Sequence, residues 1–116
     1  MLLFKEQHVP MILSGAKTQT RRLWPKGCRV KAGNVYQART KMLDSKATFA
    51  RVKVLRVWQE YLENISEADA KAEGYQDRLA YLYAFYKINE SKVPSNVNEK
   101  MLVWCVEFAV VKEGGV

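Results

Sequence analysis

Cysteine, histidine and long apolar runs are the scarcest features of this sequence. Its 116 residues include two cysteines and one histidine. Cys28 and Cys105 lie too far apart to match the spacing of a zinc site or a redox motif. His8 would need clustered carboxylates to complete a metal site, and the sequence offers no such cluster. We therefore expect no metal, no organic cofactor and reduced cysteines, with a Cys28–Cys105 disulfide as the alternative.

Membrane and export signals are also missing from the sequence. No apolar run approaches the roughly 18 residues that a membrane span needs. The apolar residues 1–4 are followed at once by Lys5 and Glu6, which makes the run too short for a signal peptide. Together with reduced cysteines, this predicts a cytoplasmic protein without a membrane partner. The length and the lack of internal repeats predict a single domain over residues 1–116 and leave the oligomeric state open.

Acidic residues are scarce in one part of the chain. Residues 17–53 contain eleven lysines and arginines but a single acid, Asp44, whereas residues 60–73 contain five acids and a single base. The formal net charge is +7. An excess of cations favours a polyanionic partner such as RNA, because neutralised phosphates release their counterions. The alternative is that the charge only keeps the protein soluble.

Short strands with a few helices between them predict an α+β fold with a small curled sheet. The patterns predict strands over residues 2–4, 47–58 and 101–111, and a Gly33-Asn34 turn followed by a strand within residues 30–39. They predict helices over residues 8–13, 67–73 and 77–88, with a polar loop over 89–100. Residues 47–58 alternate in polarity, as one half-buried barrel strand would. Ser66 and Asp69 form a capping-box pattern at the start of one helix, which Gly74 ends. In the helix over 77–88, Leu79, Leu82 and Phe85 are expected in the core.

Residues 15–22 are the strongest candidates for a functional site in the chain. They read Gly-Ala-Lys-Thr-Gln-Thr-Arg-Arg and follow a short apolar segment. In an extended segment Thr18, Thr20 and Arg22 share one face, and Lys17 lies at the turn with a stem long enough to reach either face. A cation, two hydroxyl groups and a guanidinium on one ribbon favour a site for an anion or a nucleobase.

Four of these residues form the pattern Gly-x-Lys-x-x-Thr-x-Arg, which resembles the signature of ASCH domains in the PUA-like β-barrel superfamily. The order of later motifs is similar as well: Gly33-Asn34-Val35-Tyr36, the Ser66–Gly74 helix and the strand around Val103-Trp104-Cys105-Val106-Glu107-Phe108. The resemblance implies a small PUA-like barrel with two or three peripheral helices. It also implies that RNA or a nucleotide binds in a cleft between residues 15–22 and the helix end at Glu73.

A small bacterial branch of this family hydrolyses N4-acetylcytidine with the motif lysine, the motif threonine and a downstream glutamate. By motif these roles fall on Lys17, Thr20 and Glu73, so the alternative function is an amidohydrolase acting on acylated cytidine. Thr20 would attack the acetyl carbonyl, which requires Lys17 to have a lowered pKa if it is to take the hydroxyl proton. Glu73 would protonate the leaving amine or orient the base. A ribonuclease using the motif lysine is a further enzymatic alternative, and a protein-interaction barrel is the third hypothesis.

Ligand or nucleic-acid contacts are expected from seven further residues: Gly15, Thr18, Arg21, Arg22, Trp24, Tyr36 and Tyr75. The three aromatic residues would stack on bases, with core packing as the alternative. Arg22 has a structural alternative too, an ion pair with Glu73 or Glu107. Arg21 stands where the amidohydrolase branch often has an apolar residue, and the helix over 77–88 is an addition to that branch. The double arginine and the basic region from Lys26 to Arg56 favour an anionic ligand longer than a nucleoside.

Overall fold

The computed structural model describes residues 1–90 and 100–112 of the chain. Its elements in chain order, with η marking a single 3-10 turn, are β1 (Leu2–Leu3), η1 (Glu6–His8), α1 (Val9–Ser14), β2 (Gln19–Arg22), β3 (Val35–Arg39), η2 (Ser45–Ala47), β4 (Thr48–Tyr61), η3 (Leu62–Asn64), α2 (Glu67–Ala72), α3 (Arg78–Ile88) and β5 (Leu102–Val110). Each predicted helix and strand is present, with ends that differ by a few residues. Most of the predicted polar loop, residues 91–99, lies outside the described residues.

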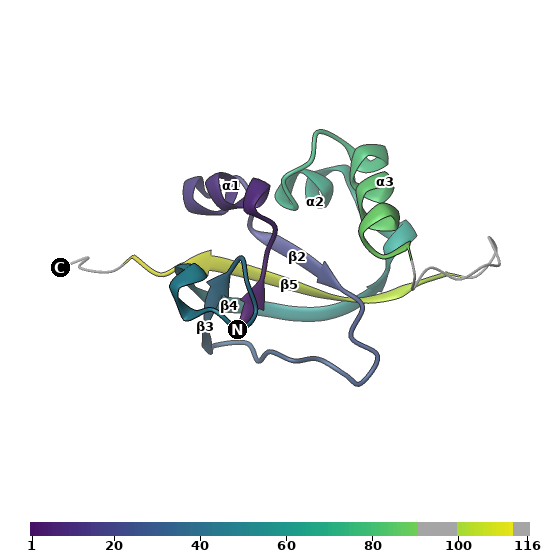
Figure 1. Ribbon diagram of the computed structural model, residues 1–116. Coiled ribbons are helices and arrows are strands. Elements are labelled where there is room, and N and C mark those ends of the chain that lie inside the picture. Colours follow the sequence, from purple (N-terminus) through teal and green to yellow (C-terminus); the bar gives the residue numbers. More distant parts are fainter. Residues whose placement is uncertain (91–99, 113–116) are drawn as a thin grey trace.

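The five strands form one sheet in the order β1-β3-β4-β5-β2. β1 runs parallel to β3, and the other neighbours are antiparallel. The three helices lie on one side of the long β4–β5 ribbon (Figure 1). β1 and β2 are the two edges, and no strand pairing joins them in the described part of the chain. The predicted α+β fold is therefore confirmed as a curled half-barrel that strand pairing does not close.

A bulge interrupts the alternation that was predicted for β4. Val54 pairs with Phe108 and Arg56 with Glu107, so Leu55 has no partner position on β5. One extra residue shifts every following side chain to the other face. Leu55 and Arg56 are consequently both exposed, and Val57 packs against the same core as Val54. The uninterrupted alternation predicted for residues 47–58 would place Leu55 and Val57 on one face, and it was wrong at this bulge.

The buried side chains form two clusters, and β5 contributes to both. Val106 and Phe108 pack with β1, α1 and β4, whereas Val103 and Cys105 pack under the last two helices. Burial on both faces explains why β5 is apolar almost throughout. In α3, Phe85 is buried as predicted and Leu82 is partly buried, but Leu79 is 76% exposed. Leu79 is on the solvent side of α3, so its assignment to the core was wrong.

The end of α2 is fastened to the start of β2, and this contact places the candidate site. Ser66 Oγ accepts from the main-chain N–H of Asp69 at 3.0 Å, which starts the helix as predicted. Asp69 does not close the capping box, because its carboxylate contacts Gln19 and Arg21 instead. At the other end, the Thr18 N–H donates to the Ala72 carbonyl at 2.7 Å. Glu73 follows directly and so comes to lie beside the motif.

Within residues 1–90 and 100–112, no helix combines the length and apolar character required to cross a bilayer.

Candidate functional site

A cavity of about 560 Å³ lies between β1, β2, the segment after β2 and α3. Seven of the ten predicted site residues line it: Lys17, Thr20, Arg21, Arg22, Trp24, Glu73 and Tyr75. The three predicted catalytic residues thus reach one cavity, although 56 positions separate Lys17 from Glu73 in the sequence. Gly15, Thr18 and Tyr36 are not among the residues that line it.

Gly15 and Thr18 shape the site through their backbones. Gly15 ends α1 with a φ of 85°, a conformation that glycine adopts without strain. Two residues later the Lys17 N–H donates to the Met11 carbonyl, and Thr18 then links α2 to β5 through its N–H and carbonyl. This turn aims the Lys17 side chain at the end of α2.

Lys17 and Glu73 form a buried ion pair at the base of the cavity. Lys17 Nζ donates to the Glu73 main-chain carbonyl at 2.7 Å and to Glu73 Oε1 at 3.1 Å. Each side chain is only 3% exposed. Burial lowers the pKa of Lys17, with contributions from Arg22 and Arg21, although the nearby Glu73 carboxylate opposes the shift. The amine is therefore less basic than a surface lysine, as the amidohydrolase hypothesis requires.

Arg21 is the centre of a network of three carboxylates. Its guanidinium contacts Glu60, Asp69 and Glu73 at 2.7, 3.2 and 2.9 Å. With the hydrogen bond to Gln19 Oε1 and a second one to Glu60, all five N–H groups are engaged. Arg21 borders the cavity, but its donors are used within the protein. The arrangement favours a role in positioning Glu73 over direct ligand contact.

Arg22 bridges the two edges of the half-barrel. Its Nε donates to Thr20 Oγ1 at 2.9 Å, and its Nη2 donates to the Leu3 carbonyl of β1 at 2.6 Å. The guanidinium also lies 5.1 Å from the centre of the Phe4 ring. The two acidic partners considered from the sequence are engaged elsewhere, since Glu73 contacts Lys17 and Arg21 and Glu107 contacts Arg56. Arg22 thus holds β1 against β2 and orients the Thr20 hydroxyl.

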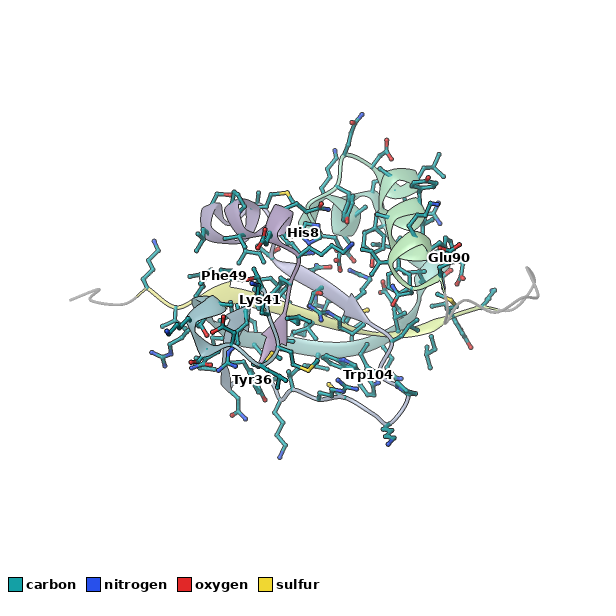
Figure 2. All side chains as sticks on the ribbon, in the orientation of Figure 1. His8, Tyr36, Lys41, Phe49, Glu90 and Trp104 are labelled. Carbon is teal, nitrogen blue, oxygen red and sulfur yellow. The ribbon has the colours of Figure 1, made fainter. Side chains whose placement is uncertain are left out.

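His8 is a cavity residue that the sequence did not single out. It lies at the start of α1, on the side facing α2 (Figure 2), and its Nε2 is 3.3 Å from the Tyr75 hydroxyl. Burial, together with Lys17, Lys5 and Arg22, lowers the pKa of His8 to about 4. His8 is therefore a neutral imidazole at physiological pH. The only signal in the sequence was that a lone histidine precedes the motif lysine, Lys17, by nine positions, which indicates no role by itself.

The predicted stacking residues have separate environments. Tyr75 lines the cavity beside His8, and half-buried Trp24 lines it near Arg29, whose guanidinium lies 6.0 Å from the ring centre. Tyr36 lies on the other side of the strands (Figure 2), packs against the core and accepts from the Lys31 N–H through its hydroxyl at 2.8 Å. Tyr36 therefore matches the core alternative.

Helix α3 forms one wall of the cavity. Tyr81 and Phe85 line it, with Ile88 and Asn89 at the helix end. Asp77 starts this helix by accepting from the Ala80 N–H at 2.8 Å. The segment that looked like an addition to the family pattern thus encloses the candidate site. Sequence reasoning assigned Phe85 to the core but did not connect α3 with ligand binding.

Metal-ligating residues do not gather in the described part of the chain: no group of three or more histidine, cysteine or acidic residues is placed to hold an ion. Cys28 and Cys105 are both free thiols. Burial raises the pKa of the Cys105 thiol to about 12, although Arg21 opposes the shift.

A family model for the ASCH domain matches residues 3–112. The chain belongs to the ASCH family. ASCH domains are generally RNA-binding PUA-like folds, and the half-barrel described above has their architecture. No curated protein matches the sequence.

Two solved structures resemble this ASCH domain. Protein EF3133 from Enterococcus faecalis has a TM-score of 0.72 at 20% identity, with 95% of this chain and 74% of that chain covered. The ASCH domain from Lactobacillus crispatus has a TM-score of 0.63 at 19% identity, with 88% of this chain and 69% of that chain covered. At these identities the similarity shows a shared fold.

Proposed function

We propose that this ASCH domain binds RNA or a nucleotide, with one nucleoside unit inside the cavity. The observation that carries the proposal is the lining of the cavity, which combines five cationic side chains and one carboxylate with aromatic rings. Its volume of about 560 Å³ falls within the range of small-molecule sites. Aromatic rings stack on bases, and cations attract the phosphates. The general RNA-binding character of the family supports the same conclusion.

The test compares two tyrosines that differ in their access to the cavity. Tyr75 lines the cavity, whereas Tyr83 on α3 is 68% exposed and does not line it. We expect Tyr75→Leu to weaken binding of short single-stranded RNA or nucleotides about tenfold, since stacking on one base contributes roughly 1–3 kcal/mol. Tyr83→Leu should leave the affinity unchanged. Equal losses in both variants would contradict binding in this cavity, and a lack of any affinity would favour a protein-interaction barrel.

A second candidate function is hydrolysis of an acylated exocyclic amine, as in N4-acetylcytidine. It is favoured by the arrangement of Lys17, Thr20 and Glu73 around one cavity. A neutral lysine amine has two N–H groups, which match the two contacts to Glu73 and leave its lone pair free to accept the Thr20 proton. The hydrogen bond from Arg22 to Thr20 Oγ1 helps to stabilise negative charge that develops on this oxygen.

The proposed reaction has two covalent steps. Thr20 Oγ attacks the acetyl carbonyl, Lys17 takes the hydroxyl proton, and the C–N bond breaks as the exocyclic nitrogen takes a proton from Lys17. Water then hydrolyses the acetyl ester, which releases acetate and regenerates the hydroxyl group. Glu73 accepts hydrogen bonds from Lys17 throughout and holds the amine in place.

Product analysis separates binding from catalysis. The protein is incubated with N4-acetylcytidine and, in parallel, with single-stranded RNA, and the products are separated by chromatography. Hydrolysis requires that cytidine and acetate form, that Thr20→Val and Lys17→Ala abolish their formation, and that Thr18→Val, outside the cavity, retains it. RNA fragments that disappear with Lys17→Ala would instead support the ribonuclease alternative. If both substrates stay intact but still bind, the result supports binding without catalysis.

A further inference from the structure

The positive charges around the cavity are not equally neutralised. Lys17 and Arg21 contact carboxylates at hydrogen-bonding distance, and Arg21 contacts three of them. The other three cations that line the cavity are Lys5, Arg22 and Arg29. Within the described residues none of these three forms an ion pair with an acid. The uncompensated charge therefore lies on the side formed by β1 and the segment after β2.

Arg22 is the most informative of the three because its side chain is partly buried where it borders the cavity. The two acceptors that it contacts within residues 1–90 and 100–112 are uncharged: the Thr20 hydroxyl and the Leu3 carbonyl. Burial lowers the pKa of Arg22, and the nearby Arg29 lowers it further, although Glu73 opposes the shift. Its Nη1 donates to no protein atom in residues 1–90 and 100–112, so two N–H groups remain for a ligand. A partly buried guanidinium that contacts only uncharged acceptors is costly, and an anion in the cavity lowers that cost.

Lys5 and Arg29 line the same cavity as Arg22. Lys5 follows β1, and Arg29 lies in the segment that leaves β2, so three separate parts of the backbone supply the cations. Lys5 and Arg29 are exposed and retain their donors for a ligand. Arg29 also lies over the Trp24 ring, which keeps the guanidinium beside an aromatic surface. Like charges from three segments repel one another unless an anion lies among them.

We infer that Arg22, Arg29 and Lys5 form a phosphate subsite, so that the ligand of the cavity is a phosphorylated nucleoside and not a bare one. The inference rests on the proposed function, since the base and sugar occupy the aromatic part of the same cavity. Guanidinium groups match the oxygens of a phosphate in a bidentate manner, and a lysine adds a point charge. The phosphate comes either from a free mononucleotide or from the backbone of an RNA chain, which the experiment separates.

The test compares ligands with and without phosphate. Isothermal titration calorimetry measures the affinity of the full chain for the four ribonucleosides, their monophosphates and a short RNA. Arg29→Gln is the main variant, because Arg22 also joins β1 to β2 and its replacement threatens folding. Lys53→Gln is the matched control, as Lys53 is an exposed cation on β4 that does not line the cavity.

We expect at least one monophosphate or the RNA to bind about tenfold more tightly than the matching nucleoside. Arg29→Gln should remove this difference and leave nucleoside affinity unchanged, whereas Lys53→Gln should preserve it. Tight binding of a monophosphate would identify a free nucleotide as the source of the phosphate. Tight binding of the RNA alone would identify the RNA backbone as the source. Equal affinities for nucleosides and phosphorylated ligands would overturn the subsite but leave the proposed function intact. A lack of binding by every ligand would overturn both.

Discussion

Replacing Arg21 by methionine should destabilise the protein strongly, because three carboxylates would lose their shared cation. The Arg21 side chain is completely buried, and its partner Glu73 is 3% exposed. Glu60 and Asp69 retain some access to water, with exposures of 22% and 32%, so the main loss is at Glu73. Removing one partner of a buried ion pair costs about 3–5 kcal/mol. A domain of this size has a total stability of roughly 5–15 kcal/mol, so the variant would lose a large share of it.

Urea denaturation followed by tryptophan fluorescence measures this loss. With a slope of about 1–2 kcal/mol/M, the expected loss moves the unfolding midpoint by roughly 1.5–5 M. Arg56→Met is the matched control, since Arg56 is 59% exposed and contacts Glu107 at 3.4 Å. Its exposed ion pair contributes about 1 kcal/mol or less. Glu73→Gln should cost less in the Arg21→Met protein than in the wild type, because only the ion pair of Glu73 with Lys17 is then left to lose.

The reasoning about Arg21 fails if Arg21→Met costs no more than Arg56→Met. It also fails if Glu73→Gln lowers the stability of the Arg21→Met protein by as much as it lowers the stability of the wild type. Either result would mean that the network does not hold Glu73 through charge.

Three further predictions concern stability and reactivity. The pKa of His8 is about 4 in the folded protein and 6.5 in the unfolded chain. The free energy of unfolding should therefore fall by at most about 3 kcal/mol as the pH is lowered from 6.5 to 4. Urea titrations at several pH values should show that His8→Gln reduces this dependence of stability on pH. A thiol reagent should label Cys28 well before buried Cys105, whose pKa is about 12, and equal native rates would contradict the burial of Cys105. Asp77→Ala should cost about 1 kcal/mol by removing the cap of α3, and an unchanged midpoint would refute that cap.

Short-range signals account for what could be predicted of the fold. Ser66 and Asp77 cap helices that begin at the next residue, and Gly74 follows the end of α2. Such signals depend on hydrogen bonds within a few residues, so they can be recognised along the chain. The bulge at Leu55 could not be recognised, because it depends on which residue of β5 lies opposite. The same limitation applies to Leu79, whose exposure depends on the side of α3 that meets the sheet.

The candidate site divides in a similar way. The motif indicated Lys17, Thr20 and Glu73, and the structure brings them to one cavity. The motif did not indicate that every N–H group of Arg21 would donate to a protein oxygen. Nor did it indicate that Arg22 would have N–H groups without an acceptor among the described residues. These two neighbours point to opposite faces of β2, and each face meets different elements. Sequence reasoning expected both to contact a ligand, and only their surroundings distinguish them.

By itself, the sequence determined the order and approximate extent of the elements, the excess of positive charge and the residue types of the motif. These properties follow from local backbone preferences and from composition. Only the tertiary structure decided that α3 encloses the cavity, that His8 lies beside Tyr75 and that Arg22 closes the half-barrel. Those contacts join segments far apart in the chain, and their energies depend on burial and distance, which arise only when the sheet has curled and the helices have packed on it.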